Sequence, residues 1–304
     1  MAKRVLVCLL LAVLATTVAL AVPSWQVLLD QYQYDQAAPL NPEVGSPTLG
    51  LTGTELTIRF SSANGERVPG LLLLPPASAG KGPYPCLLLL HGLGGSKSDA
   101  RGLAPMIAKG YAVCALDAAY HGDRKQQGKQ FFSTDVALTR QAFIQTIIDY
   151  RRAIDFLATR PEIDAKRIGL LGLSLGAMMG GVLTPVEPRI RTAVLVVGGG
   201  DWRTLLSTSQ HSAALAVRER LRADPAALDP LDSVDPLHYV EHISPRPLLM
   251  QNGRQDTVMP AACVQALWDR AKEPKCIDWY DSGHVPPIFR VLQKINDWCA
   301  KYLQ

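Results

Sequence analysis

The chain has 304 residues and a mass of 33.0 kDa, which is long enough for one large domain or two modest ones. Apolar residues make up 48% and charged residues 19%, so a buried core is expected and global disorder is excluded. The formal net charge of +4 is too small and too scattered to indicate a nucleic-acid-binding surface. Six cysteines without a Cys-x-x-Cys pair exclude a disulfide-stapled miniprotein and a zinc ribbon.

The first 22 residues have the pattern of a secretory signal peptide. A basic start precedes the apolar run 5–20, and Ala19-Leu20-Ala21 supplies the small residues of a cleavage site. We expect cleavage after Ala21, which makes residues 1–21 the signal peptide and leaves residues 22–304 as a secreted or periplasmic domain without a membrane attachment. The competing interpretation is a retained anchor helix, because the run is only slightly shorter than the roughly 20 residues that span a bilayer.

The strand pattern predicts a mostly parallel sheet. Two strand-like runs, 56–60 and 68–74, flank Asn64-Gly65, which predicts an antiparallel hairpin. After it, continuous apolar runs alternate with segments of helical length, a pattern typical of a parallel sheet covered by helices on both faces. The expected class is α/β, with a twisted sheet of about eight strands. The later runs are 86–90, 112–116, 168–173, 193–197, 247–250 and 276–279.

Three other segments are predicted to be helical. Apolar residues recur at helical spacing within 133–159, where Ser133 or Thr134 can cap the start, and again within 291–302. Residues 202–236 form a polar, Ala- and Leu-rich insertion between two predicted strands. This insertion is a candidate lid, with an ordinary crossover helix as the alternative. Trp202, its first residue, is a candidate substrate-binding residue.

Gly172-Leu173-Ser174-Leu175-Gly176 lies between a predicted strand and a predicted helix. In such a G-x-S-x-G turn the glycines allow a sharp bend, and the serine hydroxyl projects from the edge of the sheet. Ser174 is therefore the candidate nucleophile. The alternative is a glycine-rich packing turn.

A serine nucleophile needs a base and an orienting acid, and in this strand–turn–helix context both are expected downstream. His284 follows the last predicted strand, where a loop can return it to the edge of the sheet. Asp256 follows the preceding strand and is the expected acid. Asp201 is the rival, and Asp281 is expected to cap a loop.

The oxyanion of acyl transfer requires two fixed N–H donors. The glycine-rich stretch 91–95 begins where a predicted strand ends, so its backbone can turn toward Ser174. We expect the backbone N–H groups of Leu93 and Leu175 to be these donors. His91 precedes the serine and is expected to brace the loop.

Two further motifs indicate no cofactor. Residues 238–242 match the H-x-x-E-H pattern of zinc peptidases, but Pro236 and Pro245 confine them to about two helical turns. The stretch 92–97 lacks the last glycine of a dinucleotide loop and the Gly-Lys-Ser/Thr of a phosphate loop. We therefore expect neither a metal nor an organic cofactor.

From about Tyr34 onward the chain resembles the α/β-hydrolase superfamily, and within it secreted esterases related to dienelactone hydrolase, acetylxylan esterase and prolyl-oligopeptidase-like domains. The resemblance implies that the acid follows the seventh strand, as Asp256 does, and that Tyr120 lies beside the pocket and shapes its acyl side. Dienelactone hydrolase usually has cysteine where this chain has Ser174. The motifs are 68–70, 91–95, 149–155, 172–176, 245–247 and Asp256.

The expected function is that of a serine carboxylesterase that cleaves small, short-acyl esters through an acyl-enzyme. Three alternatives remain: an acetylxylan or other carbohydrate esterase acting on an acetylated carbohydrate, a peptidase of the prolyl-oligopeptidase type, and a carbohydrate-binding or scaffold domain with a degenerate hydrolase fold. No nucleic acid partner is expected, and the sequence does not indicate an oligomeric state.

Overall fold

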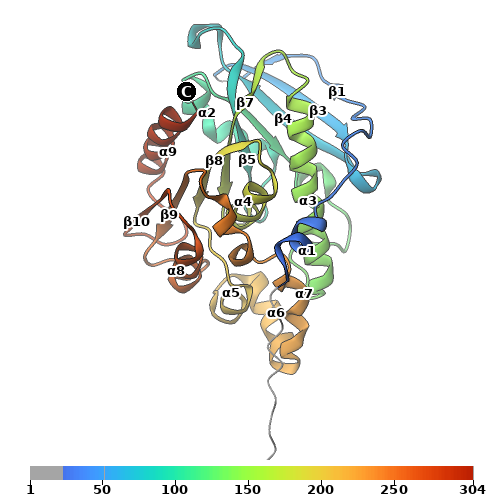
Figure 1. The fold of residues 1–304 in the computed structure, drawn as a ribbon, viewed down its shortest axis with the longest axis vertical. Helices are drawn as coiled ribbons and strands as arrows, with labels where there is room; N and C mark the ends of the chain where they lie inside the picture. The colour runs from blue at the N-terminus through green and yellow to red at the C-terminus, as the bar shows by residue number, and fades with distance from the viewer. Residues whose placement is uncertain (1–22, 51, 304) are drawn as a thin grey trace, which may run out of the picture.

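Ten strands form one twisted sheet in the computed structural model, which describes residues 23–50 and 52–303 (Figure 1). The predicted signal peptide lies outside the described residues. Along the sheet the order is β1-β3-β4-β6-β5-β7-β8-β9-β10, and β2 pairs with β3. The strands are β1 (Glu43–Val44), β2 (Thr48–Leu49), β3 (Thr54–Ser61), β4 (Arg67–Leu74), β5 (Tyr84–Leu90), β6 (Ala112–Leu116), β7 (Ile163–Leu173), β8 (Ile190–Val196), β9 (Leu248–Gly253) and β10 (Lys275–Tyr280).

The mostly parallel α/β sheet expected from the sequence is confirmed. Strands β5 to β10 pair in parallel, whereas β3, β4 and β6 pair antiparallel along the sheet. The predicted hairpin joins β3 and β4, and its turn has positive φ at Asn64 (60°) and Gly65 (74°), the conformation that this dipeptide favours. The two strands beyond the expected eight, β1 and β2, are two residues each and pair with β3.

Helices cover both faces of the sheet, and each face has its own apolar core. On one face, alternate side chains of β4 and β5 such as Leu72 and Leu88 pack with α3, α4 and α8. On the other face, Leu73 and Leu87 pack with α2 and α9. The helices are α1 (Trp25–Asp30), α2 (Ala104–Ile107), α3 (Val136–Leu157), α4 (Leu175–Val186), α5 (Trp202–Thr208), α6 (Ser212–Ala223), α7 (Asp229–Asp232), α8 (Ala261–Arg270) and α9 (Ile288–Tyr302).

The prediction for the cap of α3 was wrong. Asp135 is the N-cap, and its carboxylate accepts the N–H of Ala137 at 3.1 Å. Ser133 instead accepts the N–H of Asp135 at 3.1 Å, so it stabilises the turn that leads into the helix. Aspartate and serine are about equally good caps, and the local sequence did not separate them.

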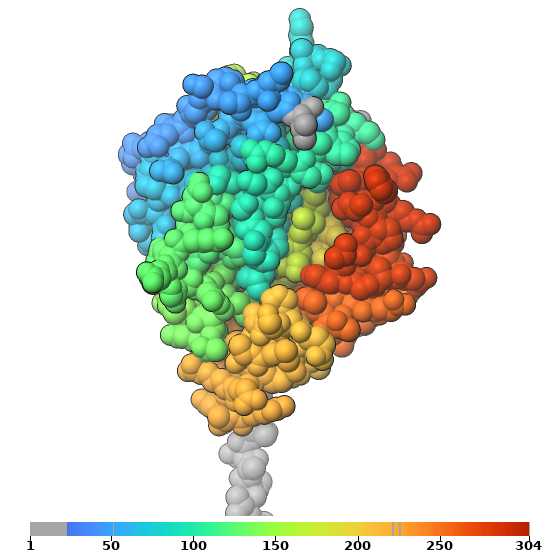
Figure 2. Space-filling view, turned by 180° about the vertical axis from the view of Figure 1, so that it is seen from behind, coloured from blue at the N-terminus to red at the C-terminus, as the bar shows by residue number. Residues whose placement is uncertain are grey.

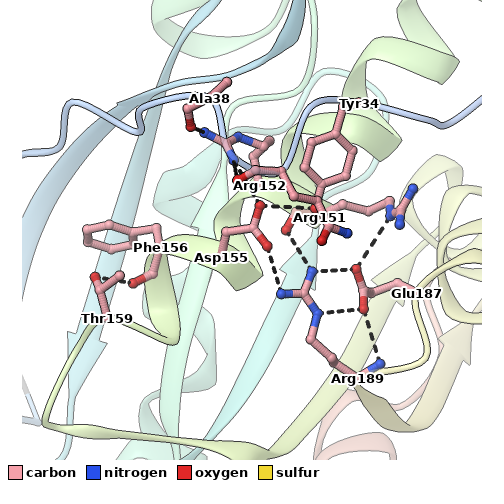
Figure 3. A network of polar contacts seen from close by, with 10 residues as sticks. Tyr34, Ala38, Arg151, Arg152, Asp155, Phe156, Thr159, Glu187 and Arg189 are labelled. Atoms are coloured by element: carbon pink, nitrogen blue, oxygen red, sulfur yellow. Dashed lines mark hydrogen bonds and ion pairs between the residues drawn. The ribbon is translucent and has the colours of Figure 1, made fainter.

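A partly buried ionic cluster ties the N-terminal segment to α3 (Figure 3). Arg189 pairs with Glu187 and with Asp155 on α3, each at 2.7 Å. Asp155 also accepts the hydroxyl of Tyr34 at 3.0 Å, and Arg152 donates to the carbonyl of Ala38 at 2.7 Å. These contacts hold the chain before β1 against α3, on the side of the molecule away from β9 and β10 (Figure 1).

Residues 202–236 fold as α5, α6, α7 and a short 3₁₀ turn at one end of the molecule. Figure 2 shows this segment in yellow to orange, beside the green surface of the chain before and within α3. Arg220 on α6 donates to the carbonyl of Thr134 at 2.9 Å, which joins the two surfaces. The insertion is therefore helical, as predicted.

The cysteines that the structure describes are all free thiols. Cys86 and Cys114 are fully buried on neighbouring strands, and burial raises the pKa of the Cys114 thiol to about 12. Cys263, Cys276 and Cys299 are likewise not joined by a disulfide. None of the helices within residues 23–50 and 52–303 has the length and apolar character needed to cross a bilayer.

Candidate active site

Ser174 sits in a strained turn between β7 and α4. Its backbone has φ 54° and ψ −115°, a conformation that costs a non-glycine residue free energy and is found mostly at functional positions. The turn needs its two glycines, because a Cβ on Gly172 would lie 2.4 Å from the carbonyl oxygen of Gly176. A Cβ on Gly176 would lie 2.0 Å from the carbonyl oxygen of Leu90 at the end of β5.

The structure brings Ser174, His284 and Asp256 together, although they are far apart in the sequence. The Oγ of Ser174 lies 2.9 Å from Nε2 of His284, and Nδ1 of His284 lies 2.7 Å from Oδ2 of Asp256. A carboxylate accepts the Nδ1–H, so Nε2 is left as the acceptor for the serine hydroxyl. The side chain of Asp256 is 1% exposed and that of His284 is 26% exposed, so the carboxylate is buried and the imidazole is partly accessible to solvent.

The turn that follows Asp256 holds its carboxylate in place. Its Oδ1 accepts the N–H groups of Val258 at 2.8 Å and Met259 at 2.9 Å, which leaves Oδ2 aimed at His284. The rival Asp201 caps α5 instead, where it accepts the backbone N–H and the hydroxyl of Thr204. The carboxylate that contacts the imidazole is therefore that of Asp256.

Two buried histidines hold the loop that follows β5. Nε2 of His91 accepts the N–H of Ala118, and its Nδ1–H donates to the carbonyl of Gly92 at 2.8 Å. Nε2 of His121 accepts the N–H of Gly94, and its Nδ1–H donates to the carbonyl of Ala119. Burial lowers the pKa of both imidazoles, which favours the neutral form that these contacts require. His91 braces the loop as predicted, whereas His121 was not singled out.

A buried carboxylate fixes the far end of the same loop. Asp117 is fully buried after β6, and it accepts the backbone N–H of Lys97 at 2.8 Å and its ammonium at 2.7 Å.

The predicted oxyanion donors Leu93 and Leu175 both line the cavity that contains Ser174. Leu175 is the first residue of α4, where a backbone N–H has no acceptor within the helix. Both residues therefore lie at the candidate site, and the role of their N–H groups as oxyanion donors stays a prediction.

The cavity at Ser174 and His284 has a volume of about 290 Å³ and mostly apolar walls. Part of its wall comes from the 202–236 segment, and Phe132 closes another side. Such a space can enclose a small apolar group bonded to the carbon that Ser174 attacks. Its apolar lining includes Leu93, Phe132, Leu175, Met178, Leu205, Val258 and Met259.

The two residues that were expected to bind substrate occupy different places. Tyr120 is half-buried with φ 60° and lines a second hollow that adjoins the cavity. Trp202 is 0% exposed and packs on Phe132 and Phe143, with ring centroids 5.6 and 6.1 Å apart. A side chain without exposed surface cannot touch a substrate in this conformation. Trp202 instead packs against Phe132, which lines the cavity.

The H-x-x-E-H motif is used for packing. His242 stacks on Trp25 with centroids 3.8 Å apart, and Glu241 pairs with Lys272 at 2.9 Å. Within the part of the chain that the structure describes, no group of histidine, cysteine or acidic side chains is arranged to hold a metal.

The fold and the site define the class of the α/β hydrolases. Residues 99–304 match the prolyl oligopeptidase family, which is more than half of the chain, and the protein belongs to this family. The prolyl oligopeptidase family is a family of hydrolases, and the relatives of the chain include an esterase.

Curated relatives are distant in sequence. The chain is similar to Esterase YjfP of Escherichia coli, with 26% identity over 186 residues, 59% of this chain and 71% of that protein. It is 31% identical to Acyl-coenzyme A thioesterase 1 of Mus musculus over 133 residues, 43% of this chain and 27% of that protein. It spans 52% of the length of a Bacillus subtilis relative that is 26% identical over 160 residues.

Solved structures share the fold at low identity. An acetyl xylan esterase from Paenibacillus sp. R4 has a TM-score of 0.76 at 20% identity, with 91% of this chain and 92% of that chain covered. The acylaminoacyl peptidase of Pyrococcus horikoshii has a TM-score of 0.65 at 18% identity, with 86% of this chain and 42% of that chain covered.

Proposed function

We propose that the protein is a serine carboxylesterase that hydrolyses small, short-acyl esters through an acyl-enzyme. The observation that carries the proposal is the chain of contacts from Ser174 Oγ through His284 to Asp256, at 2.9 and 2.7 Å. These are the distances over which a base can take the serine proton and a carboxylate can orient the base.

In this proposal, Ser174 attacks the ester carbonyl carbon while its proton passes to Nε2 of His284. The carbonyl oxygen becomes an oxyanion that accepts the N–H groups of Leu93 and Leu175. His284 then protonates the leaving alcohol, and the acyl group stays on Ser174. Water repeats the sequence with His284 as base, and the acid is released. Asp256 keeps the Nδ1–H of His284 in place throughout.

The walls of the cavity support a preference for short acyl groups. Its volume of about 290 Å³ is small and its lining is mainly leucine, methionine, valine and phenylalanine side chains. The 202–236 segment, which supplies Leu205 and Ala214 to the wall, is proposed as a lid whose opening admits longer groups. Export through the predicted signal peptide of residues 1–21 remains part of the proposal.

A peptidase activity is the second candidate, because the family contains peptidases. The same three side chains could cleave an amide, so the two candidates differ in substrate and share the chemistry.

The test is a hydrolysis screen with the wild type and Ser174→Ala. The screen contains 4-nitrophenyl esters of increasing acyl length, acetylated xylo-oligosaccharide and a proline-containing peptide anilide. We expect turnover of the short esters, and a loss of about 10⁴-fold or more in Ser174→Ala. Ser207→Ala removes an exposed hydroxyl on α5 and is the matched control. Cleavage of the anilide without cleavage of the esters would favour the peptidase, and a Ser174→Ala variant of undiminished rate would refute both.

A further inference from the structure

A second hollow of about 680 Å³ opens beside the candidate active site. It shares four lining residues with the cavity at Ser174, and Leu93 and Phe132 are two of them. The hollow lies between the 120–132 segment and α6, which are neighbours on the face shown in Figure 2. A substrate bound at Ser174 can therefore extend into it past Leu93 and Phe132.

The hollow is basic. Lys125 and Lys129 line it, and no aspartate or glutamate is among its lining residues. Neither ammonium group forms an ion pair within the described residues, whereas the nearby Lys97 is paired with Asp117 and Asp123. The Lys129 ammonium lies 5.8 Å from the ring centroid of Tyr120. The positive charge of Lys125 also contributes to lowering the pKa of the buried His121, after the larger effect of burial.

His211 stands at the junction and lines both spaces. It caps α6, where its Nδ1 accepts the N–H of Ala213 at 3.1 Å. An imidazole that accepts at Nδ1 carries its proton at Nε2, so it has a donor left over. Within the described residues no protein acceptor takes up this Nε2–H. A hydrogen-bond donor at the entrance and two unpaired ammonium groups beyond it are suited to an oxygen-bearing anion.

Tyr120 gives the hollow a rigid wall. Its φ of 60° is strained for a residue with a side chain, and it directly precedes His121, which anchors Gly94. An aromatic face beside unpaired lysines can cover the apolar part of an organic anion while the charge meets the ammonium groups.

We propose that this hollow is a subsite for a negatively charged substituent, so that the preferred substrates are esters with a carboxylate some distance from the scissile bond. The inference rests on the proposed ester hydrolysis at Ser174 and adds the charge class of the substrate. The carboxylate can belong to the acyl half or to the alcohol half, and the experiment separates these two sources.

The experiment compares two matched pairs of esters at low ionic strength. In the first pair the acyl group carries the charge, as in 4-nitrophenyl hydrogen adipate against 4-nitrophenyl hexanoate. In the second pair the leaving group carries it, as in 4-acetoxybenzoate against methyl 4-acetoxybenzoate. We expect the kcat/KM ratio of charged to neutral ester to exceed one in one of the pairs and to fall as salt is added. The pair that responds identifies the half of the substrate that enters the hollow.

Lys125 and Lys129 are both exposed. The variant Lys125→Gln/Lys129→Gln should lower that ratio about threefold to tenfold, as expected for the loss of two exposed ion pairs. The control is Lys81→Gln/Lys109→Gln, which removes the same charge from two exposed lysines that precede β5 and β6, at the opposite end of these strands. The control should leave the ratio unchanged. His211→Asn retains an N-cap acceptor but withdraws the Nε2–H, and it should also lower the ratio.

The failures of the two proposals are distinguishable. Hydrolysis of neutral esters with equal ratios in the wild type and the Lys125/Lys129 variant would overturn the subsite and leave the esterase proposal intact. If no ester is cleaved, the subsite is tested by measuring the binding of 4-acetoxybenzoate to the wild type and to both lysine variants by calorimetry. Binding that is weakened only in Lys125→Gln/Lys129→Gln supports the subsite, and no binding or equal binding overturns it.

Discussion

The backbone N–H of Gly94 donates to Nε2 of His121 at 3.1 Å, and this contact joins the loop after β5 to the loop after β6. The two strands are neighbours in the sheet, so their carboxyl ends bring the loops to the same edge. Gly94 directly follows Leu93, whose N–H is the proposed oxyanion donor. The position of that donor therefore depends on a histidine that has no direct contact with Ser174.

Replacement of His121 by alanine should slow catalysis more than it weakens substrate binding. Without the imidazole, Gly94 loses its acceptor and the Leu93 N–H is less well positioned for the oxyanion. We expect kcat to fall about 10- to 100-fold with a smaller change in KM, because the loss of an oxyanion donor itself costs about 10²–10³. Steady-state kinetics on 4-nitrophenyl acetate measure this. His238→Ala, outside the candidate site, is the control, and an equal loss in both variants would contradict the role of His121.

The buried histidines predict a decrease in stability at acidic pH. Burial lowers the pKa of His91 and His121 in the folded protein, so the unfolded chain binds protons that the folded chain does not. The free energy of unfolding should therefore be constant above about pH 7 and should fall as pH drops below about 6.5, the ordinary pKa of histidine. Urea unfolding between pH 5 and pH 8 measures this. His121→Gln should give a shallower dependence than the wild type, and an unchanged slope would contradict the assignment.

Asp256 and Asp201, the two candidates for the acid, should differ sharply in how much activity is lost when each is replaced by asparagine. Asp256→Asn leaves the shape of the side chain but removes the carboxylate that accepts Nδ1–H of His284, and we expect kcat to fall about 10⁴-fold. Asp201→Asn can still cap α5 and should retain activity within about threefold. Both variants are compared by kcat on the same short ester. A larger loss in Asp201→Asn would reverse the assignment of the acid.

Gly176 should tolerate no side chain. An alanine Cβ would lie 2.0 Å from the carbonyl oxygen of Leu90, and neither backbone can move without displacing β5 or α4. We expect Gly176→Ala to lower the free energy of unfolding by about 3 kcal/mol or more and to abolish activity. Gly102→Ala is the control, because nothing lies within 4 Å of its Cβ, and it should change stability by less than about 1 kcal/mol. Urea denaturation followed by circular dichroism gives both values.

The strands and the turn at Ser174 were predictable because their signals are local. Continuous apolar runs, Asn64-Gly65 and the glycines around Ser174 each determine backbone geometry within a few residues. His284 and Asp256 were found for a related reason. Each follows a strand of a parallel sheet, and the carboxyl ends of such strands share one edge.

Trp202, His121 and His211 were not predictable, because their roles depend on contacts between distant segments. Trp202 is the first residue of the inserted segment, yet it is buried because it packs on Phe132 and Phe143 from another part of the chain. His121 acts through Gly94, which lies 27 residues away. His211 lies between the cavity and the hollow only because α6 packs near the 120–132 segment.

The central claim is that the Oγ of Ser174 is an activated nucleophile, and covalent labelling tests it most directly. The protein is treated with a fluorophosphonate probe, digested, and mapped by mass spectrometry, with His284→Ala and Ser207→Ala treated in parallel. We predict one adduct, on Ser174, that forms rapidly in the wild type and in Ser207→Ala and slows by several orders of magnitude in His284→Ala. An unlabelled Ser174, or a rate of labelling that is unaffected by His284→Ala, would contradict the account.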